Sequence, residues 1–162
     1  MRLVISDTTP LNYLILIGYA NALHGLFGHL IVPPAVIREL RHPKAPKSVD
    51  DWAANLPGWI EIRAPKVNLG LDLGSGENEA ISLAAECTET VLLLIDDGTA
   101  RAAAEDRGLA VIGTLAVLDL AYRAAFLDFE HAIMLLQETS FHIEKTLLAT
   151  VLAQVRARKL RR

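Results

Sequence analysis

The sequence predicts an α/β fold built on a central, mostly parallel β-sheet, and three observations support this prediction. Short runs rich in Val, Ile and Leu alternate along the chain with stretches that have the period of a helix. One run, Val91–Ile95, is apolar throughout, as expected of a parallel strand buried on both faces. The chain has 162 residues, of which 52% are hydrophobic and 22% charged, and this suits one compact core. We therefore expect residues 1–162 to form a single domain.

The predicted elements follow one another in a regular order. Five runs are predicted to be strands, the third of them the weakest: Leu3–Ile5, Leu30–Val32, Ile60–Ile62, Val91–Ile95 and Ala110–Ile112. Five stretches have a helical pattern: Pro10–Ile17, Pro34–Leu40, Glu77–Cys87, Thr99–Arg107 and Leu115–Ala125. Two more helices are expected to close the chain, and the last has an apolar face made of Ile143, Leu147, Leu148, Val151, Leu152 and Val155. The stretches Arg41–Lys47 and Ala64–Gly76 are predicted to be loops.

Composition and charge exclude several classes of protein. Cys87 is the only cysteine, so neither an intrachain disulfide nor a cysteine-based zinc site is available, as in proteins of a reducing cytoplasm. No apolar run reaches the roughly 20 residues of a membrane helix, and Asp7 and Pro10 interrupt any signal peptide. We expect a cytoplasmic protein with no membrane partner. The net charge of -3 is unusual for a nucleic-acid binder, but Arg156–Arg162 holds five basic side chains that can contact phosphates.

Acidic residues follow the predicted strands at positions that the topology brings together. Asp7 comes directly after the first strand, and Asp96 and Asp97 come directly after Val91–Ile95. Glu77 and Glu79 open the helix that leads into that strand, so they start at the same edge of a parallel sheet. Ligands of open parallel sheets bind beyond this carboxyl edge. Glu39 lies on a short helix after the second strand, and topology alone does not place it.

Each of these acids also has a purely structural interpretation. Asp7 can cap the helix that Pro10 begins, Glu77 and Glu79 can complement a helix dipole, and Asp96 and Asp97 can form an ordinary turn before Gly98. Glu39 alone fits a solvated helix face. Several carboxylates at one edge repel one another, however, and bound divalent cations remove that penalty.

Taken together, the acids predict a site for a divalent metal ion. An all-oxygen site with open water positions suits Mg²⁺ or Mn²⁺. Such ions turn water into a nucleophile for phosphodiester hydrolysis. The sequence shows no histidine, cysteine or serine arrangement that would serve as a nucleophile instead. The five histidines have no metal-ligand spacing, and Trp52 and Trp59 are expected to pack in the core or an interface.

Four segments resemble the acidic motifs of PIN domains in their order and spacing. Ile5–Leu11 (Ile-Ser-Asp-Thr-Thr-Pro-Leu) resembles the opening of these domains, and Val36–Leu40 resembles their second motif. Gly76–Ile81 and Leu94–Arg101 resemble the third and fourth motifs, and Val111–Leu115 is similar to the strand and turn that follow. The resemblance is to a VapC-like branch of the family and covers nearly the whole chain.

The resemblance implies a three-layer α/β/α fold and an endoribonuclease that depends on Mg²⁺ or Mn²⁺. It also implies a homodimer, an RNA substrate and a cognate antitoxin that blocks the active site. The implied metal ligands are Asp7, Glu39, one acid of the pair Glu77 and Glu79, and Asp97. We prefer Glu79 within the pair, because it directly precedes the apolar Ala80 and Ile81.

Further residues would support these ligands. Asp96 would bind the metal or orient a neighbouring group, and Thr9 would fix the Asp7 carboxylate or a metal-bound water. Arg101 would steady a carboxylate or contact phosphate, with a surface salt bridge as the equal alternative. Ala116 stands where this branch often has glycine, and Ala125–Leu127 replaces a common glycine-containing turn. The rival interpretation is a non-catalytic PIN-like module that binds RNA or a protein.

Overall fold

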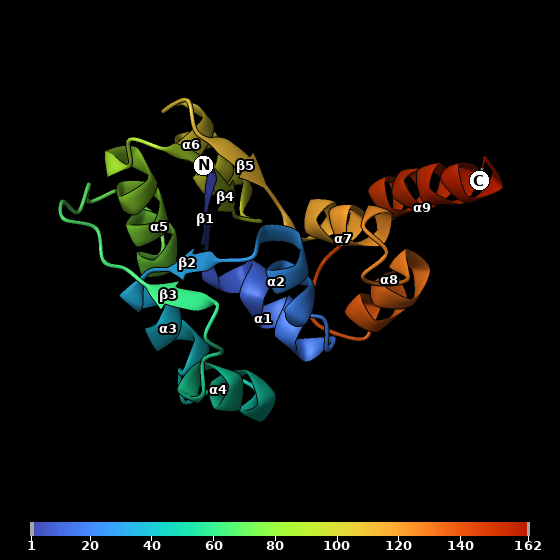
Figure 1. Ribbon diagram of the computed structural model, residues 1–162, viewed down its shortest axis with the longest axis horizontal. Coiled ribbons are helices and arrows are strands. Elements are labelled where there is room, and N and C mark those ends of the chain that lie inside the picture. The colour runs from blue at the N-terminus through green and yellow to red at the C-terminus, as the bar shows by residue number, and fades with distance from the viewer. Residues whose placement is uncertain (1, 162) are drawn as a thin grey trace.

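The central element is a five-stranded sheet whose strands are all parallel (Figure 1). The computed structural model describes residues 2–161. The strands are β1 (Arg2–Ser6), β2 (Leu30–Val32), β3 (Ile60–Ile62), β4 (Thr90–Leu94) and β5 (Ala110–Ile112), arranged in the order β3-β2-β1-β4-β5. All five predicted strands are present, and the prediction of a mostly parallel sheet is confirmed.

The helices match the predicted helical stretches, with two additions. The helices that connect and follow the strands are α1 (Thr8–Leu16), α3 (Pro34–Leu40), α5 (Ser75–Glu86), α6 (Gly98–Glu105) and α7 (Thr114–Arg123). Two short helices were not predicted, α2 (Asn21–Phe27) and α4 (Lys47–Ala54). Gly25 weakens the helical pattern of α2. In α4, Val49, Trp52 and Ala53 do have the spacing of one helical face, but the Pro- and Lys-rich stretch before them favoured a loop.

Alternate residues of the strands face two separate hydrophobic cores. Leu3 and Ile5 of β1 pack with the buried residues of α5 and α6, while Val4 packs on the other side with α1, α2, α3 and α7. In β4, Leu93 faces the first core and Leu92 the second. This period of two places a helical layer on each face of the sheet. The three-layer α/β/α architecture is therefore confirmed.

The strand order creates a switch point between β1 and β4. The chain builds β2 and β3 on one side of β1 and then returns to build β4 and β5 on the other side. The backbone N–H of Asp7 donates to the carbonyl of Leu94 at 3.0 Å, directly after the paired residues Ser6 and Leu94. Ligands of open α/β sheets bind at such a switch point. The fold thus brings the ends of β1 and β4 together, where the first and fourth acidic motifs begin.

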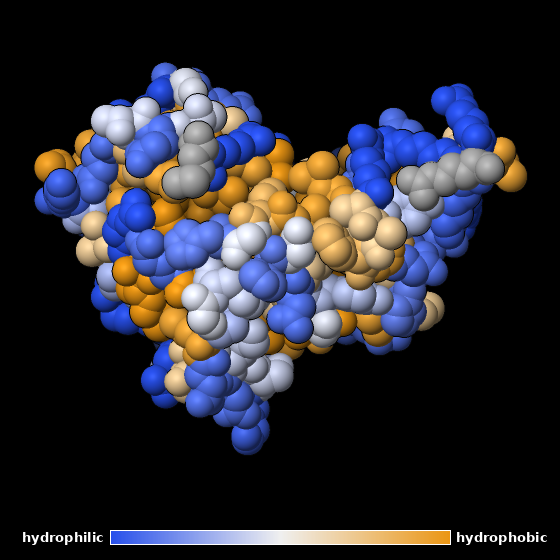
Figure 2. All heavy atoms as spheres, in the orientation of Figure 1, coloured by the Kyte–Doolittle hydropathy of each residue, from blue (hydrophilic) through white to orange (hydrophobic). Residues whose placement is uncertain are grey.

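The last two helices, α8 (Phe129–Gln137) and α9 (Lys145–Leu160), lie away from the sheet beside α7 (Figure 1). Ile143 was predicted to lie on the apolar face of the last helix, but it precedes the first residue of α9. Val155 is buried, whereas Leu147 is 48% exposed. The side of α9 visible in Figure 2 is largely hydrophilic. No helix within residues 2–161 is long and apolar enough to span a membrane.

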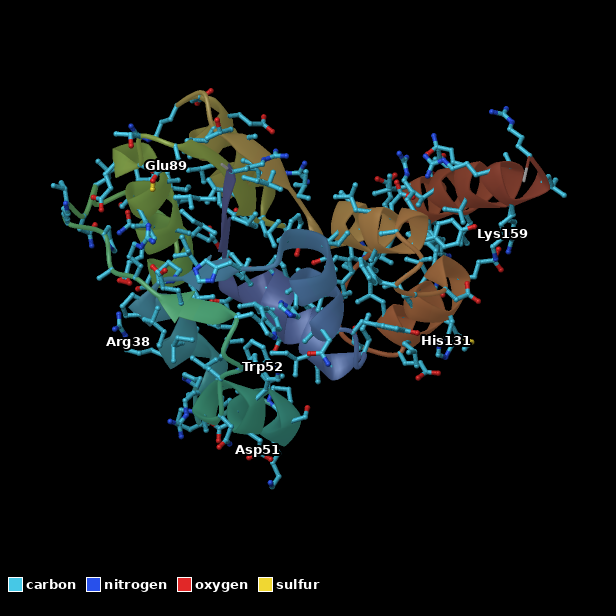
Figure 3. The ribbon with its side chains drawn as sticks, in the orientation of Figure 1. Arg38, Asp51, Trp52, Glu89, His131 and Lys159 are labelled. Atoms are coloured by element: carbon cyan, nitrogen blue, oxygen red, sulfur yellow. The ribbon has the colours of Figure 1, made fainter. Side chains whose placement is uncertain are left out.

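The basic residues of α9 mostly pair with acids of neighbouring helices. Arg156 pairs with Glu130 at 3.0 Å, and Arg158 pairs with Asp119 at 2.7 Å. Lys159, labelled in Figure 3, lies 3.8 Å from a carboxylate oxygen of α8's N-cap residue. These three side chains hold α9 against α7 and α8, which weakens the prediction that the basic terminus contacts phosphate. Arg162 lies outside the described residues.

Candidate active site

Asp7 is the buried centre of the acidic cluster. It occupies the N-cap position of α1, is only 2% exposed, and makes no capping hydrogen bond with its side chain. Its Oδ1 is the single buried side-chain polar atom without a hydrogen-bond partner in residues 2–161. Burial raises the pKa of Asp7 to about 7, and the charges of Glu77, Glu39 and Asp96 add to the rise, while the Thr8 backbone N–H opposes it. The capping interpretation of Asp7 therefore does not account for its side chain.

Glu39 joins three segments of the chain at this point. Its Oε1 accepts a hydrogen bond from the backbone N–H of Gly76 at 2.9 Å, at the start of α5. Its Oε2 accepts a hydrogen bond from the hydroxyl of Thr8, in the first turn of α1. The sequence did not place Glu39, and the structure brings it to the same edge of the sheet as Asp7. The solvated-face interpretation of Glu39 is wrong, because both of its oxygens are engaged by the first turns of other helices.

Gly76 makes the close approach of these groups possible. A Cβ atom at this position would lie 2.7 Å from Oε2 of Glu39 and 2.9 Å from both Oδ1 of Asp7 and Oγ1 of Thr8. Real Cβ atoms do not come so close to other heavy atoms, so any side chain here would force the acids apart. The N-terminal turn of α5 also presents backbone N–H groups and the positive end of a helix dipole to the carboxylates.

Glu77 and Glu79 belong to different surroundings. Oε1 of Glu79 accepts a hydrogen bond from the backbone N–H of Ala35 at 2.9 Å, and its Oε2 lies 3.6 Å from the guanidinium of Arg38. Arg38 is labelled on α3 in Figure 3. Glu79 therefore stabilises the first turn of α3. Burial raises the pKa of Glu77, and the charges of Asp97 and Glu39 raise it further, so Glu77 is the member of the pair that is electrostatically coupled to the other acids.

Asp96 is held firmly by Thr114. Its Oδ1 accepts the backbone N–H of Thr114 at 2.8 Å, and its Oδ2 accepts the Thr114 hydroxyl at 2.6 Å. Burial raises the pKa of Asp96, while these two hydrogen bonds and the charge of Arg101 oppose the rise. Gly113 leaves room for this contact, because a Cβ there would lie 2.7 Å from Oδ1 of Asp96. Asp96 thus links the end of β4 to the start of α7.

Asp97 lies on the solvent side of the cluster. Its Oδ2 accepts the backbone N–H of Ala100 at 2.9 Å and caps α6. The predicted alternative of an ordinary turn is wrong, because Gly98 is the first residue of α6 and Asp97 is its N-cap. Oδ1 of Asp97 makes no hydrogen bond within residues 2–161, and the side chain is exposed. One of its oxygens thus remains open to solvent next to Glu77, whose pKa its charge raises.

Thr9 and Arg101 line a cavity beside the acids rather than the buried cluster itself. The cavity has a volume of about 570 Å³ and includes Asp96 and Asp97 in its wall. The threonine that bonds to the acidic cluster is Thr8, which sequence reasoning missed together with Gly76 and Thr114. These three residues stand inside the quoted motifs, but only a three-dimensional arrangement shows which carboxylate each one contacts.

The acidic side chains of the described residues do not form a complete metal-binding site as they stand. Across residues 2–161, no three aspartate, glutamate, histidine or cysteine side chains lie close enough together to hold a metal ion as they stand. Within residues 2–161 no histidine hydrogen-bonds to these acids, although His142 lines the cavity that Asp96 and Asp97 border. Trp52 and Trp59 pack against the core and lie edge to face, with ring centroids 6.2 Å apart. The expectation that the two tryptophans pack against the core is therefore confirmed.

Comparison with known proteins identifies the family. No relative was found among curated proteins, and no solved structure matches the chain. A family model described as a PIN domain matches residues 3–157, which is almost the entire sequence. PIN domains are generally metal-dependent nucleases. Because the match spans all five strands and the acidic edge that they form, the chain belongs to the PIN-domain family.

Proposed function

We propose that this protein is an endoribonuclease that hydrolyses phosphodiester bonds with the help of Mg²⁺ or Mn²⁺. The observation that carries the proposal is the unpartnered Oδ1 of Asp7, buried among the charges of Glu39, Glu77 and Asp96. A buried carboxylate oxygen without a donor is costly, and a cation would supply the missing partner. A group that serves only stability would be expected to have a protein donor at this position.

The donor set fits a hard divalent cation. Asp7, Glu39, Glu77 and Asp97 offer only carboxylate oxygens, which Mg²⁺ and Mn²⁺ prefer. We place Glu77 in this set instead of Glu79, because both oxygens of Glu79 are used by Ala35 and Arg38. Asp96 is assigned a positioning role, since both of its oxygens already accept hydrogen bonds from Thr114. Glu39 also accepts two hydrogen bonds, but it stays in the set because its Oε2 lies beside the open Oδ1 of Asp7 at the Gly76 position. When bound, the ion would supply an activated water and stabilise developing negative charge.

The chain's own residues would orient the reaction around that ion. Thr8 and the Gly76 N–H fix the Glu39 carboxylate, and Thr114 fixes Asp96, so two acids are held in one orientation before substrate arrives. Such preorganisation lowers the cost of reaching the transition state. Asp97 faces solvent and marks the side from which a polynucleotide would approach. Arg101, beside Asp97 in the cavity wall, is suited to contact a phosphate.

The biological setting that the family resemblance suggests is a toxin–antitoxin pair. We propose that the chain is the toxin, that it acts as a homodimer in the cytoplasm, and that a cognate antitoxin covers the acidic edge. Met134 and Leu147, which are exposed on the last two helices, are candidate contacts for such a partner.

Titration with Mn²⁺ tests the proposal against its rival, a non-catalytic PIN-like module that binds RNA or protein. Calorimetry at neutral pH should show binding to the wild-type protein and a loss of at least tenfold in affinity in Asp7→Asn, whose fold is checked by circular dichroism. Glu105→Gln, which replaces an exposed acid at the far end of α6, serves as the control and should bind Mn²⁺ as the wild type does. Absence of binding at millimolar Mn²⁺ and Mg²⁺ would favour the rival.

A further inference from the structure

The chain between β3 and α5 runs along the outer side of α5, where side chains of that helix hold it (Figure 1). Asn78, Ser82 and Glu86 are spaced four residues apart and therefore lie along one face of α5. Each of them accepts a hydrogen bond from a backbone N–H group of residues 66–71. The strap, as we call residues 64–74, is thus attached to α5 along most of the length of the helix.

Asn78 makes the attachment that lies nearest to the acidic cluster. Its Oδ1 accepts the backbone N–H of Leu71 at 2.9 Å, and its Nδ2 donates to Oδ1 of Asn68 at 2.7 Å. The same oxygen of Asn68 accepts the backbone N–H of Gly70 at 2.8 Å. Asn78 is only 8% exposed. Because one of its atoms accepts and the other donates, the contact requires an amide side chain.

The first turn of α5 has little in its own sequence to hold it in place. Its N-cap residue, Gly74, has no side chain that could accept a backbone N–H, and Ser75 is exposed. Gly76 adds the conformational freedom of glycine. Yet this turn carries the N–H that orients the Glu39 carboxylate, and it must approach the acids closely. Contacts from outside the turn must therefore supply its order.

Asn78 supplies such contacts on both sides of the turn. Its backbone N–H donates to the carbonyl of Gly74 at 2.9 Å and closes the turn, while its side chain fixes Leu71 in the chain that enters it. The N–H of Leu73 donates to the carbonyl of Leu71 at 2.8 Å, and both leucine side chains pack against the core under α5. The segment that enters the first turn is therefore bound to a residue directly after that turn.

We propose that Asn78 is a positioning residue for the nuclease reaction, because it clamps the strap to α5 and so holds the Gly76 N–H against the Glu39 carboxylate. This inference rests on the proposed nuclease function and adds a residue that acts through the backbone. Without the amide of Asn78, the strap loses its attachment next to the acids, while Ser82 and Glu86 still hold the rest of it. The first turn of α5 then moves more freely, and Glu39 loses its fixed orientation.

Asn78→Ala tests the clamp, and Ser82→Ala is its matched control. Both side chains are buried and hold a backbone N–H of the strap, but Ser82 lies one helical turn farther from the acids. Alanine is a better helix former than asparagine, so Asn78→Ala does not weaken α5 itself. Asn68→Ala removes the partner of the Asn78 amide from an exposed position and should give a smaller effect of the same kind. Circular dichroism confirms that all three variants fold.

Amide hydrogen exchange of the full chain in chelator, followed by NMR, gives a readout that needs neither a metal ion nor a substrate. In the wild type, the amides of Gly76 and Leu69 should both be protected, because each donates a hydrogen bond. Asn78→Ala should speed the exchange of the Gly76 amide by roughly tenfold or more and change that of Leu69 by less than about threefold. Ser82→Ala should show the reverse. Equal exchange of the Gly76 amide in Asn78→Ala and the wild type would overturn the proposal.

Titration with Mn²⁺ and cleavage of an RNA strand that the wild type cuts show whether this order matters for the reaction. Asn78→Ala should bind Mn²⁺ roughly tenfold more weakly, because Glu39 is no longer held in one orientation. At a fixed Mn²⁺ concentration its kcat should fall by a similar factor, while KM for RNA stays within about twofold, as expected of a loss of orientation rather than of substrate binding. Ser82→Ala should match the wild type in both assays.

Two outcomes separate this inference from the proposed function. If Asn78→Ala speeds the exchange of the Gly76 amide but binds Mn²⁺ and cuts RNA as the wild type does, the positioning role is wrong and the nuclease stands. If the wild type binds no Mn²⁺ and cuts no RNA, the nuclease assignment is wrong, while faster exchange of the Gly76 amide in Asn78→Ala still supports the clamp.

Discussion

The Glu39 carboxylate accepts a hydrogen bond of 2.9 Å from the backbone N–H of Gly76 and so ties the end of α3 to the first turn of α5. The other Glu39 oxygen accepts the hydroxyl of Thr8, at the start of α1. Three motifs that are far apart in the sequence therefore meet in one hydrogen-bonded unit next to Asp7.

Gly76→Ala should disable the site while leaving the fold intact. The added Cβ would lie 2.7 Å from Oε2 of Glu39 and 2.9 Å from Oδ1 of Asp7, so the two carboxylates must move apart. We expect at least a tenfold fall in Mn²⁺ affinity and in RNA cleavage. Alanine normally stabilises a helix relative to glycine by about 0.5–1 kcal/mol. Because the added Cβ collides with the two carboxylates, Gly76→Ala should not gain this stability.

Gly74→Ala is the matched control for that change. A Cβ at Gly74 would lie 3.7 Å from the nearest atom, an oxygen of Glu77, which is ordinary van der Waals contact. Its cleavage rate, measured under the same conditions, should stay within about threefold of wild type. Equal activity of Gly76→Ala and Gly74→Ala would contradict the assignment of Gly76 as the point where the acids converge.

Glu77→Gln should reduce cleavage with little change in stability, whereas Glu79→Gln should reduce stability and leave most of the cleavage activity. Glu77→Gln removes a charge coupled to Asp97 and Glu39, so cleavage should fall by at least a hundredfold with little change in stability. Glu79→Gln weakens the contacts with Ala35 and Arg38 at the start of α3. It should lower the free energy of unfolding by about 0.5–1.5 kcal/mol and leave most of the activity. Single-turnover cleavage and urea unfolding measure the two effects.

Reversal of this pattern would restore Glu79 as the ligand that the sequence favoured. Such a result, with cleavage lost in Glu79→Gln and kept in Glu77→Gln, would show that Glu79 leaves α3 when a metal ion binds. Arg38→Gln is the control for the structural role of Glu79, because it removes the same ion pair from the other side. Arg38→Gln should therefore leave cleavage unchanged in either case.

Asp7→Asn should stabilise the metal-free protein in a pH-dependent way. Burial raises the folded-state pKa of Asp7 to about 7, above the 3.8 of an unperturbed carboxyl group. Between these values the folded state binds more protons than the unfolded state, so this group costs stability as pH rises. Asparagine carries no charge and avoids that cost. At pH 8 in chelator, the variant should be more stable than wild type by roughly 2–4 kcal/mol.

Urea unfolding between pH 4 and pH 8 measures this difference. The gap between Asp7→Asn and wild type should shrink toward zero as the pH falls to about 4, because the folded-state carboxyl is then protonated and the unfolded-state carboxyl approaches its own pKa of 3.8. Added Mn²⁺ should stabilise the wild type and have little effect on the variant, because binding to the folded state alone raises its stability. A gap that is constant with pH would show that the Asp7 carboxylate is not destabilised by burial.

Ala125→Gly should stabilise the protein. Ala125 has a φ of 63°, in the left-handed region, and its N–H donates to the carbonyl of Tyr122 while the N–H of Phe126 donates to that of Ala121. This is the C-terminal motif of helices that usually carries glycine. The strain of an alanine there exceeds the entropy cost of glycine, and we expect a gain of roughly 0.5–1 kcal/mol.

Ala124→Gly is the control for this change, and we expect it to destabilise the protein. Ala124 has a φ of -85°, which any residue adopts, so Ala124→Gly should lower the free energy of unfolding by about 0.5–1 kcal/mol. Thermal and urea unfolding of the two variants compare the effects directly. A destabilisation of similar size in both would show that Ala125 is not strained.

The sequence predicted the sheet well because its strands carry clear local signals. Leu30–Val32 and Ala110–Ile112 were placed with their bounds correct, and the buried run at Val91–Ile95 was displaced by one residue. The short helix α2 was missed because Gly25 interrupts its helical pattern. The helix α4 was missed although Val49, Trp52 and Ala53 have helical spacing, because the Pro- and Lys-rich stretch before it favours a loop. Ile143 was assigned to the last helix because periodicity alone does not fix where a helix begins.

The sequence was enough to predict at which edge of the sheet the site lies, but not which residues contact one another there. The parallel topology was enough to expect Asp7 and the acids after β4 at one place. The choice between Glu77 and Glu79 depends on the direction of two side chains separated by about half a helical turn, which the sequence does not encode in an obvious pattern. Glu39 could not be placed because its partner, the N–H of Gly76, is a backbone group.

The most direct test of the central claim is cleavage of a mixed RNA pool by the purified, partner-free protein. The assay compares Mn²⁺, Mg²⁺ and a chelator, and it includes Asp7→Asn and Asp97→Asn, both checked for folding. A nuclease that holds its metal ion with Asp7 and Asp97 should cleave with either ion, should not cleave in chelator, and should lose cleavage in either variant. Cleavage that persists in chelator or in both variants, or no cleavage by the folded wild type across the whole pool, would contradict it.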